Sequence, residues 1–246
     1  MMNNTRRIRT FIGAMMLAAA ITAGYATFVS HALHTYFALA VLVLAAVTSR
    51  MKVKLPGING NMSVNLPFLL TAVVSLSAAE AVIITCVSTA VQCSPRKNAR
   101  FNPQQMAFNL SMMAFASCLA SLMFHAHPGM QWSSGTLGLM LATATLFLGQ
   151  TAPVAAIVAV SEGKAAGQIW WSLAHLSFPY YIVSAGVTTM VQAVSSHVGW
   201  GLALAVFPVM YGIHRSYRTY FGAITENLRA QALRPEGRVR AASAGA

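Results

Sequence analysis

Residues 62–93 read MSVNLPFLLTAVVSLSAAEAVIITCVSTAVQC, a mostly apolar stretch of 32 residues between two clusters of basic residues. Two ordinary membrane spans need about forty residues plus a turn, whereas one span needs about twenty. A single span would place the two basic clusters on opposite sides of a membrane, against the positive-inside rule. The stretch is therefore predicted to enter the membrane and return, either as two short or tilted helices or as a re-entrant hairpin.

The turn of this hairpin is predicted near residues 76–80, which read LSAAE. Short or broken helices at membrane depth are tolerated only where protein or a water-filled cavity covers their backbone. The hairpin is therefore expected to line an interior of the protein, with its polar residues facing inward or toward the outer mouth of a cavity.

All sixteen Lys and Arg residues fit one side of a single membrane threading. They lie before the first apolar run and in every second loop after it, while the loops between carry none. These residues are Arg6, Arg7, Arg9, Arg50, Lys52, Lys54, Arg96, Lys97, Arg100, Lys164, Arg215, Arg218, Arg229, Arg234, Arg238 and Arg240. Because basic residues are enriched in cytoplasmic loops, both termini are predicted to be cytoplasmic.

The composition also favours a membrane protein. Hydrophobic residues make up 57% of the chain and charged residues 8%, whereas soluble domains carry about 25% charged residues. There are four Glu and no Asp, so paired-carboxylate catalysis and Ser-His-Asp triads lack a necessary residue. No enzymatic activity, cofactor or metal is therefore expected. The net charge of +12 is interpreted as attraction to anionic lipid headgroups, not to nucleic acid.

The expected fold is an all-α, polytopic transmembrane helical bundle of about eight spans in four out-and-back hairpins. The number falls to seven if the short hairpin or the first apolar run has been misjudged. Residues 1–10 are predicted to be a basic cytoplasmic N-terminus and 11–214 the transmembrane domain. A cytoplasmic amphipathic helix is predicted over 215–233 and a disordered tail over 234–246. The bilayer itself is the principal expected partner.

Six polar residues within or beside the apolar runs are candidates for a cavity or ligand site: Glu80, Asn65, Asn109, Gln150, His175 and Tyr180. An ionisable group at membrane depth is costly to bury, which makes Glu80 a functional candidate. The alternative is that Glu80 is hydrated at the outer end of the hairpin. Inter-helix hydrogen bonds, at roughly 1 kcal/mol each, would equally explain the amides and the histidine.

An apolar stripe follows the last predicted span. Tyr217, Phe221, Ile224 and Leu228 are spaced four, three and four residues apart, which is typical of one face of a helix. Such a helix could mediate homodimerisation or bind a signalling partner. The alternative is a helix that lies on the lipid headgroups.

Several short motifs resemble the membrane-integral sensory (MASE-like) domain that precedes GGDEF and HD-GYP domains in bacterial cyclic-di-GMP proteins. They are residues 52–65 (KVKLPGINGNMSVN), Phe108-Asn109, 161–163 (SEG), 178–181 (FPYY), 208–211 (PVMY) and 215–220 (RSYRTY). The resemblance covers about residues 35–225. It implies a multi-helix input module in the bacterial cytoplasmic membrane that passes a signal through its last helix.

The chain departs from that family in having no GGDEF-like or HD-GYP-like sequence after the last span. The expected function is therefore a stand-alone sensory module without catalytic output. The alternative is a transport component, because residues 54–57 (KLPG) followed by a short hairpin also resemble the substrate-binding membrane subunits of energy-coupling-factor transporters.

Overall fold

The computed structural model describes residues 2–30, 35–54, 61–95, 101–125 and 135–198, together with residues 208, 211–212, 215–216, 219–220 and 222–223. The predicted last span, 198–213, and the loops at 31–34 and 126–134 lie largely or wholly outside the described residues. The membrane threading as a whole therefore stays a prediction.

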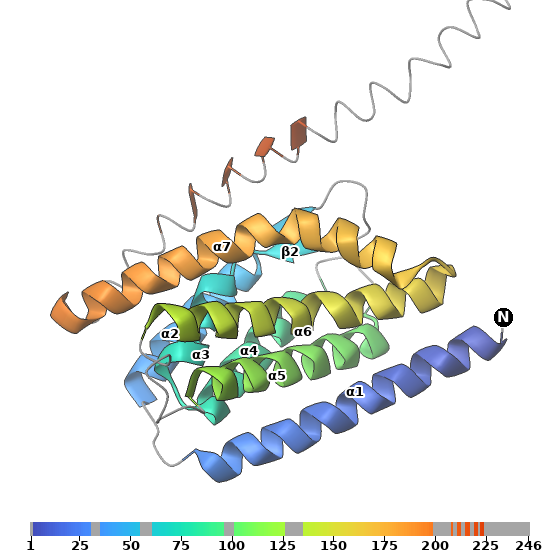
Figure 1. Ribbon diagram of the computed structural model, residues 1–246, viewed down its shortest axis with the longest axis horizontal. Helices are drawn as coiled ribbons and strands as arrows, with labels where there is room; N and C mark the ends of the chain where they lie inside the picture. The colour runs from blue at the N-terminus through green and yellow to red at the C-terminus, as the bar shows by residue number, and fades with distance from the viewer. Residues whose placement is uncertain are drawn as a thin grey trace, which may run out of the picture.

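Helices dominate the described residues, as predicted, and most of them lie side by side along the long axis of the molecule (Figure 1). The helices are α1 (Met2–Val29), α2 (Thr35–Ser49), α3 (Leu66–Ser75), α4 (Ala78–Cys93), α5 (Pro103–His125), α6 (Thr136–Glu162) and α7 (Ala166–Val198). The predicted all-α class is confirmed for the described residues, in which two short strands also lie between α2 and α3.

These strands, β1 (Lys52–Lys54) and β2 (Asn61–Ser63), form an antiparallel ribbon in which Lys52 pairs with Ser63 and Lys54 with Asn61. The ribbon continues into a backbone hydrogen bond from the Val64 amide to the Met51 carbonyl, at 3.3 Å. It therefore fixes where the chain enters α3.

Within the part of the chain that the structure describes, three helices are long and apolar enough to cross a membrane: Thr5–Val29 within α1, Pro103–His125 and Thr136–Glu162. Shorter apolar helices cover Tyr36–Ser49, Leu66–Ser75 and Ala78–Cys93. A helix rises about 1.5 Å per residue, so the ten residues of α3 reach only about 15 Å, roughly half of the hydrocarbon core of a bilayer.

The apolar stretch 62–93 is broken into two short helices, as its length predicted. α3 ends at Ser75 and α4 begins at Ala78, so the break falls within the predicted turn region. Leu76 adopts an extended conformation after α3. A continuous helix through this position is therefore ruled out.

α3 lies at the centre of the bundle. All nine of its residues from Leu66 to Val74 are buried, and the helix contacts α2, α4, α5, α6 and α7. The largest cluster of buried apolar residues includes most of α3 together with side chains from α1, α2, α5, α6 and α7. α3 thus lies in the core of the bundle, enclosed by its neighbouring helices.

α5 and α6 approach each other closely at Gly149. A Cβ atom placed on Gly149 would lie 2.7 Å from the Cβ of Ala116, so no larger residue fits without displacing the facing helix. Small residues at a crossing let two helix backbones approach, which is a common basis of packing between membrane helices.

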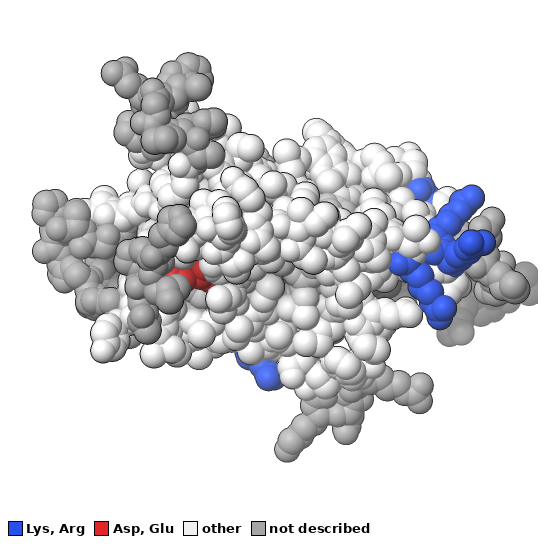
Figure 2. All heavy atoms as spheres, turned by 90° about the horizontal axis from the view of Figure 1, so that it is seen from below, with Lys and Arg blue, Asp and Glu red and all other residues white. Residues whose placement is uncertain are grey.

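Charge is unevenly distributed over the surface. Figure 2 shows most of the visible Lys and Arg side chains at one end of the long axis, and the visible acid toward the other end. The start of α1 and the connection between α6 and α7 lie at the same end of the molecule (Figure 1).

Candidate functional site

The residues around the start of α3 form a buried polar junction. Asn65 immediately precedes the helix, but its side chain does not cap it. Instead its amide nitrogen Nδ2 donates a hydrogen bond to Ser88 Oγ at 2.7 Å. The Ser88 hydroxyl in turn donates to the Ala45 carbonyl at 3.0 Å. This chain of bonds joins α2, α3 and α4 through groups that are all shielded from solvent.

α7 completes the junction from the other side. The Leu66 amide donates to the hydroxyl of Tyr180 at 3.2 Å, which satisfies a first-turn N–H group that has no partner within its own helix. Thr188, two turns further along α7, donates to the Pro67 carbonyl at 3.3 Å. Both α7 side chains are buried. Three residues that precede or begin α3 therefore meet partners from α4 and α7.

Tyr181, the neighbour of Tyr180, reaches a different helix. Its hydroxyl donates to Gln150 Oε1 on α6 at 2.6 Å, and its ring packs edge-on against Phe147 with centroids 5.0 Å apart. Phe178 packs edge-on against the same phenylalanine, at 6.0 Å. The segment 178–181 thus connects α7 to both α3 and α6.

Gln150 carries the one buried side-chain nitrogen or oxygen atom, among the described residues, that has no hydrogen-bond partner. The atom is its amide nitrogen Nε2, while its amide oxygen is held by Tyr181. Burying a polar group without a partner costs free energy. This makes Gln150 the least satisfied polar residue of the described bundle.

Glu80 is buried and serves as part of a helix cap. Its carboxylate oxygen Oε2 accepts hydrogen bonds from the Ser77 amide at 3.0 Å and from the Ser77 hydroxyl at 2.7 Å. The Glu80 amide donates back to Ser77 Oγ at 3.4 Å, which completes a capping box at the start of α4. Only 5% of Glu80 is exposed. This burial disfavours the alternative in which the acid is hydrated at the outer end of the hairpin.

The start of α4 also receives a partner from α1. The Ala79 amide donates to the hydroxyl of Ser30 at 3.1 Å. Ser30 directly follows α1, so the end of that helix lies against the break between α3 and α4.

The remaining candidates lie apart from the junction. Asn109 on α5 donates its Nδ2 to the sulfur of Cys93 at 3.3 Å, and His175 is exposed on α7. Of the six candidates, the structure therefore brings Asn65 and Tyr180 together at the start of α3. Gln150 is linked only to the neighbouring tyrosine, and Glu80, Asn109 and His175 occupy other places.

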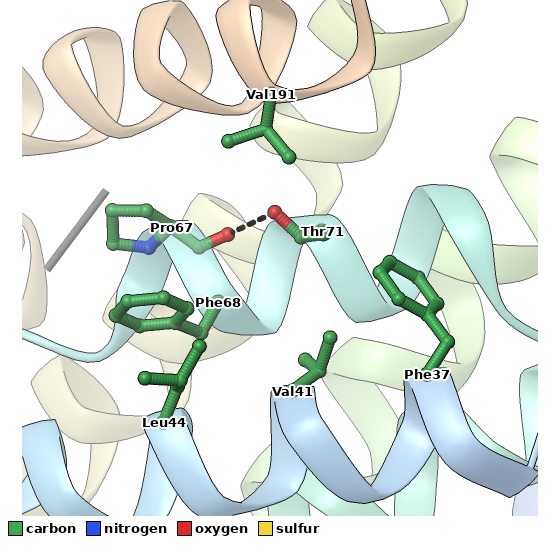
Figure 3. A pocket seen from close by; sticks show the side chains of 7 residues that line it. All are labelled: Phe37, Val41, Leu44, Pro67, Phe68, Thr71 and Val191. Atoms are coloured by element: carbon green, nitrogen blue, oxygen red, sulfur yellow. Dashed lines mark hydrogen bonds between the residues drawn. The ribbon is translucent and has the colours of Figure 1, made fainter. Parts of the chain in front are cut away.

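A small apolar pocket lies between α2, α3 and α7 (Figure 3). Its lining consists of Phe37, Val41, Leu44, Pro67, Phe68, Thr71 and Val191. The Thr71 hydroxyl is engaged with the Pro67 carbonyl at 2.8 Å. The pocket volume is about 20 Å³, enough for about one water molecule. α3 contributes Pro67, Phe68 and Thr71 to this lining, and none of the six candidate residues lines the pocket.

No group of three or more His, Cys, Asp or Glu side chains that could hold a metal ion occurs in the part of the chain that the structure describes. The predicted output residues Tyr217, Phe221, Ile224 and Leu228 lie outside the described residues.

One feature of the site was within reach of sequence reasoning. Ser77-Ala-Ala-Glu80 has the spacing of a capping box before an apolar run, so the acid could have been placed at a helix start. Ser88 and Thr188, by contrast, sit in apolar runs with nothing to distinguish them from other small polar residues.

Comparison of the chain with known proteins finds no family model, no curated protein and no solved structure that matches it.

Proposed function

We propose that this chain is a membrane-integral signal-input module without catalytic activity, threaded about eight times through a bacterial cytoplasmic membrane with both termini in the cytoplasm. In this proposal the bundle senses or integrates a stimulus, and the predicted amphipathic helix over 215–233 passes it on. The resemblance to sensory domains of cyclic-di-GMP proteins supports the assignment, as does the partition of all sixteen Lys and Arg residues between alternate loops.

The distribution of apolar surface supports the membrane placement. Large apolar side chains are exposed on several helices, among them Leu17 and Phe28 on α1, Leu141 and Leu148 on α6, and Ile182 on α7. Monomeric soluble proteins rarely expose contiguous apolar surface of this kind. Lipid tails would cover it at no cost.

The observation that carries the signalling role is the exposure of the described residues beyond the predicted last span, 198–213. All six described residues between 215 and 223 are helical and exposed, including Tyr220. An exposed helix beyond the last membrane-embedded element is available to a second protein or a second copy. It is the part of the chain best suited to transmit a change in the bundle.

The transport alternative receives less support from the described residues. A substrate-binding subunit needs a pocket that encloses a vitamin-sized molecule, and ligand pockets measure about 300–1,000 Å³. The pocket between α2, α3 and α7, at about 20 Å³, is far smaller than that. The buried polar junction is likewise occupied by hydrogen bonds within the protein.

Crosslinking through the C-terminal helix tests the proposal. In membranes, the parent protein should crosslink to a partner or a second copy through this helix. The double variant Phe221→Ser and Leu228→Ser should insert normally and lose the crosslink, because two apolar contacts of on the order of 1 kcal/mol each are removed. The control variant Ala223→Ser and Ala230→Ser has the same spacing off the stripe and should crosslink like the parent. A parent protein that never crosslinks, or a stripe variant that crosslinks unchanged, would contradict the output role.

A further inference from the structure

The first turns of α1 carry three exposed arginines without acidic partners among the described residues. Arg6, Arg7 and Arg9 are all exposed, and the described part of the chain contains no carboxylate within ion-pair distance of any of them. Three positive charges therefore lie within four residues of sequence with no compensation from the described protein.

These arginines are held in place by the apolar residues between them. Ile8 and Phe11 pack against the buried core, and the ring of Phe11 lies 6.1 Å from that of Phe108 on α5. The arginines therefore belong to a helix that is docked on the bundle. Their charges occupy a defined position at one end of a helix that is long enough to cross a bilayer.

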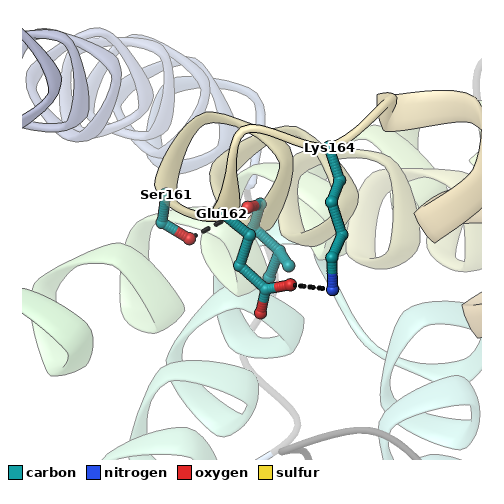
Figure 4. A network of polar contacts seen from close by, with 4 residues as sticks. Ser161, Glu162 and Lys164 are labelled. Atoms are coloured by element: carbon teal, nitrogen blue, oxygen red, sulfur yellow. Dashed lines mark hydrogen bonds and ion pairs between the residues drawn. The ribbon is translucent and has the colours of Figure 1, made fainter.

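Lys164 lies at the same end of the molecule but is neutralised by the protein. Its ammonium nitrogen Nζ is 2.7 Å from Glu162 Oε2 across the left-handed Gly163 that ends α6 (Figure 4). This pair has no net charge, whereas the three α1 arginines contribute a charge of +3. Lys164 therefore has an acidic partner, whereas the three arginines of α1 have none among the described residues.

Trp171 marks the expected depth of this end in a bilayer. It lies one to two turns into α7 and is 68% exposed, and its neighbour Trp170 donates from Nε1 to Thr151 at 3.2 Å. Exposed tryptophans are enriched at the level of the lipid headgroups. The tryptophan and the arginines are therefore both expected close to the headgroup layer.

We propose that Arg6, Arg7 and Arg9 bind the phosphate groups of anionic phospholipids and give the protein a preference for such lipids around the start of α1. The chemistry is charge complementarity between docked, uncompensated guanidinium groups and headgroup phosphates, which Arg contacts with two parallel hydrogen bonds. The inference rests on the membrane placement in the proposed function, but not on signalling through the C-terminal helix.

The test measures lipid preference in vesicles that contain phosphatidylcholine with either spin-labelled phosphatidylglycerol or spin-labelled phosphatidylcholine. The parent protein should restrict the anionic label on the order of threefold more than the neutral one. The variant Arg6→Gln, Arg7→Gln and Arg9→Gln should lower that ratio at least twofold. The double variant Glu162→Gln and Lys164→Gln, which keeps the net charge, should leave the ratio unchanged, and Glu162→Gln alone, which releases the lysine charge, should raise it.

Orientation is controlled separately, because the same arginines help to orient α1. The variant Arg6→Lys, Arg7→Lys and Arg9→Lys keeps the charge and should retain most of the preference. In the parent, raising the salt concentration should weaken the preference, since exposed charges are screened over about 10 Å at 0.1 M salt. Inorganic phosphate should have no effect beyond that of chloride at equal ionic strength.

Three results would overturn the inference. A parent ratio near one would show that no anionic lipid is selected, and an unchanged ratio in the glutamine variant would place the preference elsewhere. A specific loss with inorganic phosphate would assign the arginines to a soluble anion.

Insertion is scored in the same samples by resistance to alkaline extraction from neutral vesicles. Failure to insert would overturn both the inference and the membrane placement, whereas normal insertion with a ratio near one would leave the proposed function standing.

Discussion

α3 and α1 are both apolar helices, but they occupy opposite environments. Nine consecutive residues of α3 are buried on every side, whereas α1 presents Leu17, Ile21 and Phe28 outward. In water, such a difference would be visible in the sequence as a polar face on α1. In a bilayer, lipid and protein core are both apolar. A buried helix such as α3 is therefore distinguished from an outer helix such as α1 by its polar hydrogen bonds and its close packing.

The comparison explains why α3 needs the polar junction at its start. A ten-residue helix cannot place its terminal amides in the headgroup region on both sides of a membrane. The Leu66 amide instead donates to the Tyr180 hydroxyl within the protein. In α1 the described threonine hydroxyl bonds are local, as for Thr27 with the Gly24 carbonyl, and the Thr22 carbonyl accepts a bond from the Cys118 thiol of α5 at 3.1 Å.

The largest expected difference between the two helices comes from removing a large side chain. Leu70→Ala, at a position with no exposed surface, should lower the free energy of unfolding by about 2–5 kcal/mol, because it leaves a cavity in the core. Leu17→Ala, at a position that is 64% exposed, should change it by less than about 0.5 kcal/mol. Reversible unfolding in mixed micelles measures both. Equal losses would show that α1 is as enclosed as α3.

A smaller difference is expected from adding one methyl group. Gly149→Ala places a Cβ 2.7 Å from that of Ala116 and should cost about 1–3 kcal/mol through overpacking. Gly24→Ala on α1 meets no atom within 4 Å and should be neutral or stabilise the helix by up to about 1 kcal/mol. The same unfolding measurement applies. A tolerated alanine at Gly149 would mean that α5 and α6 can separate without loss.

The smallest difference is expected from removing one hydroxyl. Ser88→Ala deprives the Asn65 amide of its acceptor and Ala45 of its donor, and should cost about 1 kcal/mol, within the range found for hydrogen bonds between membrane helices. Thr27→Val removes a local bond on exposed α1 and should cost less than about 0.5 kcal/mol. A thermal unfolding series on both variants checks the order. A reversed order would place the polar junction outside the stabilising core.

Much of the fold could be predicted from the sequence because the bilayer restricts the alternatives so strongly. The length of 62–93 and the basic residues on both sides required a break, and the helix ends at Ser75 and resumes at Ala78. The ribbon of β1 and β2 was missed, although Pro56, Gly57 and Gly60 between the strands are residues that favour turns. Its strands have three residues each, too few for an alternating pattern to stand out.

The candidate site was less predictable for a physical reason. A polar residue in an apolar run signals that a partner exists, but not which residue that partner is. Asn65 was singled out as a polar candidate, and its partner Ser88 lies 23 residues away on another helix. Glu80 was weighed as a ligand group or a hydrated acid, and local capping by Ser77 accounts for its burial. Pairings of this kind are decided by packing, which periodicity does not encode.

The bonds that hold the start of α3 have a consequence for the order of synthesis. Leu66 and Tyr180 are 114 positions apart, and Pro67 and Thr188 are 121 apart. At about 5–20 residues per second, the ribosome takes roughly six to twenty-four seconds to deliver α7 after α3 has been made. During that interval α3 can join α2, α4, α5 and α6, but not α7. The helices made before α7 must therefore wait, with the start of their central helix incompletely bonded, until α7 packs against it.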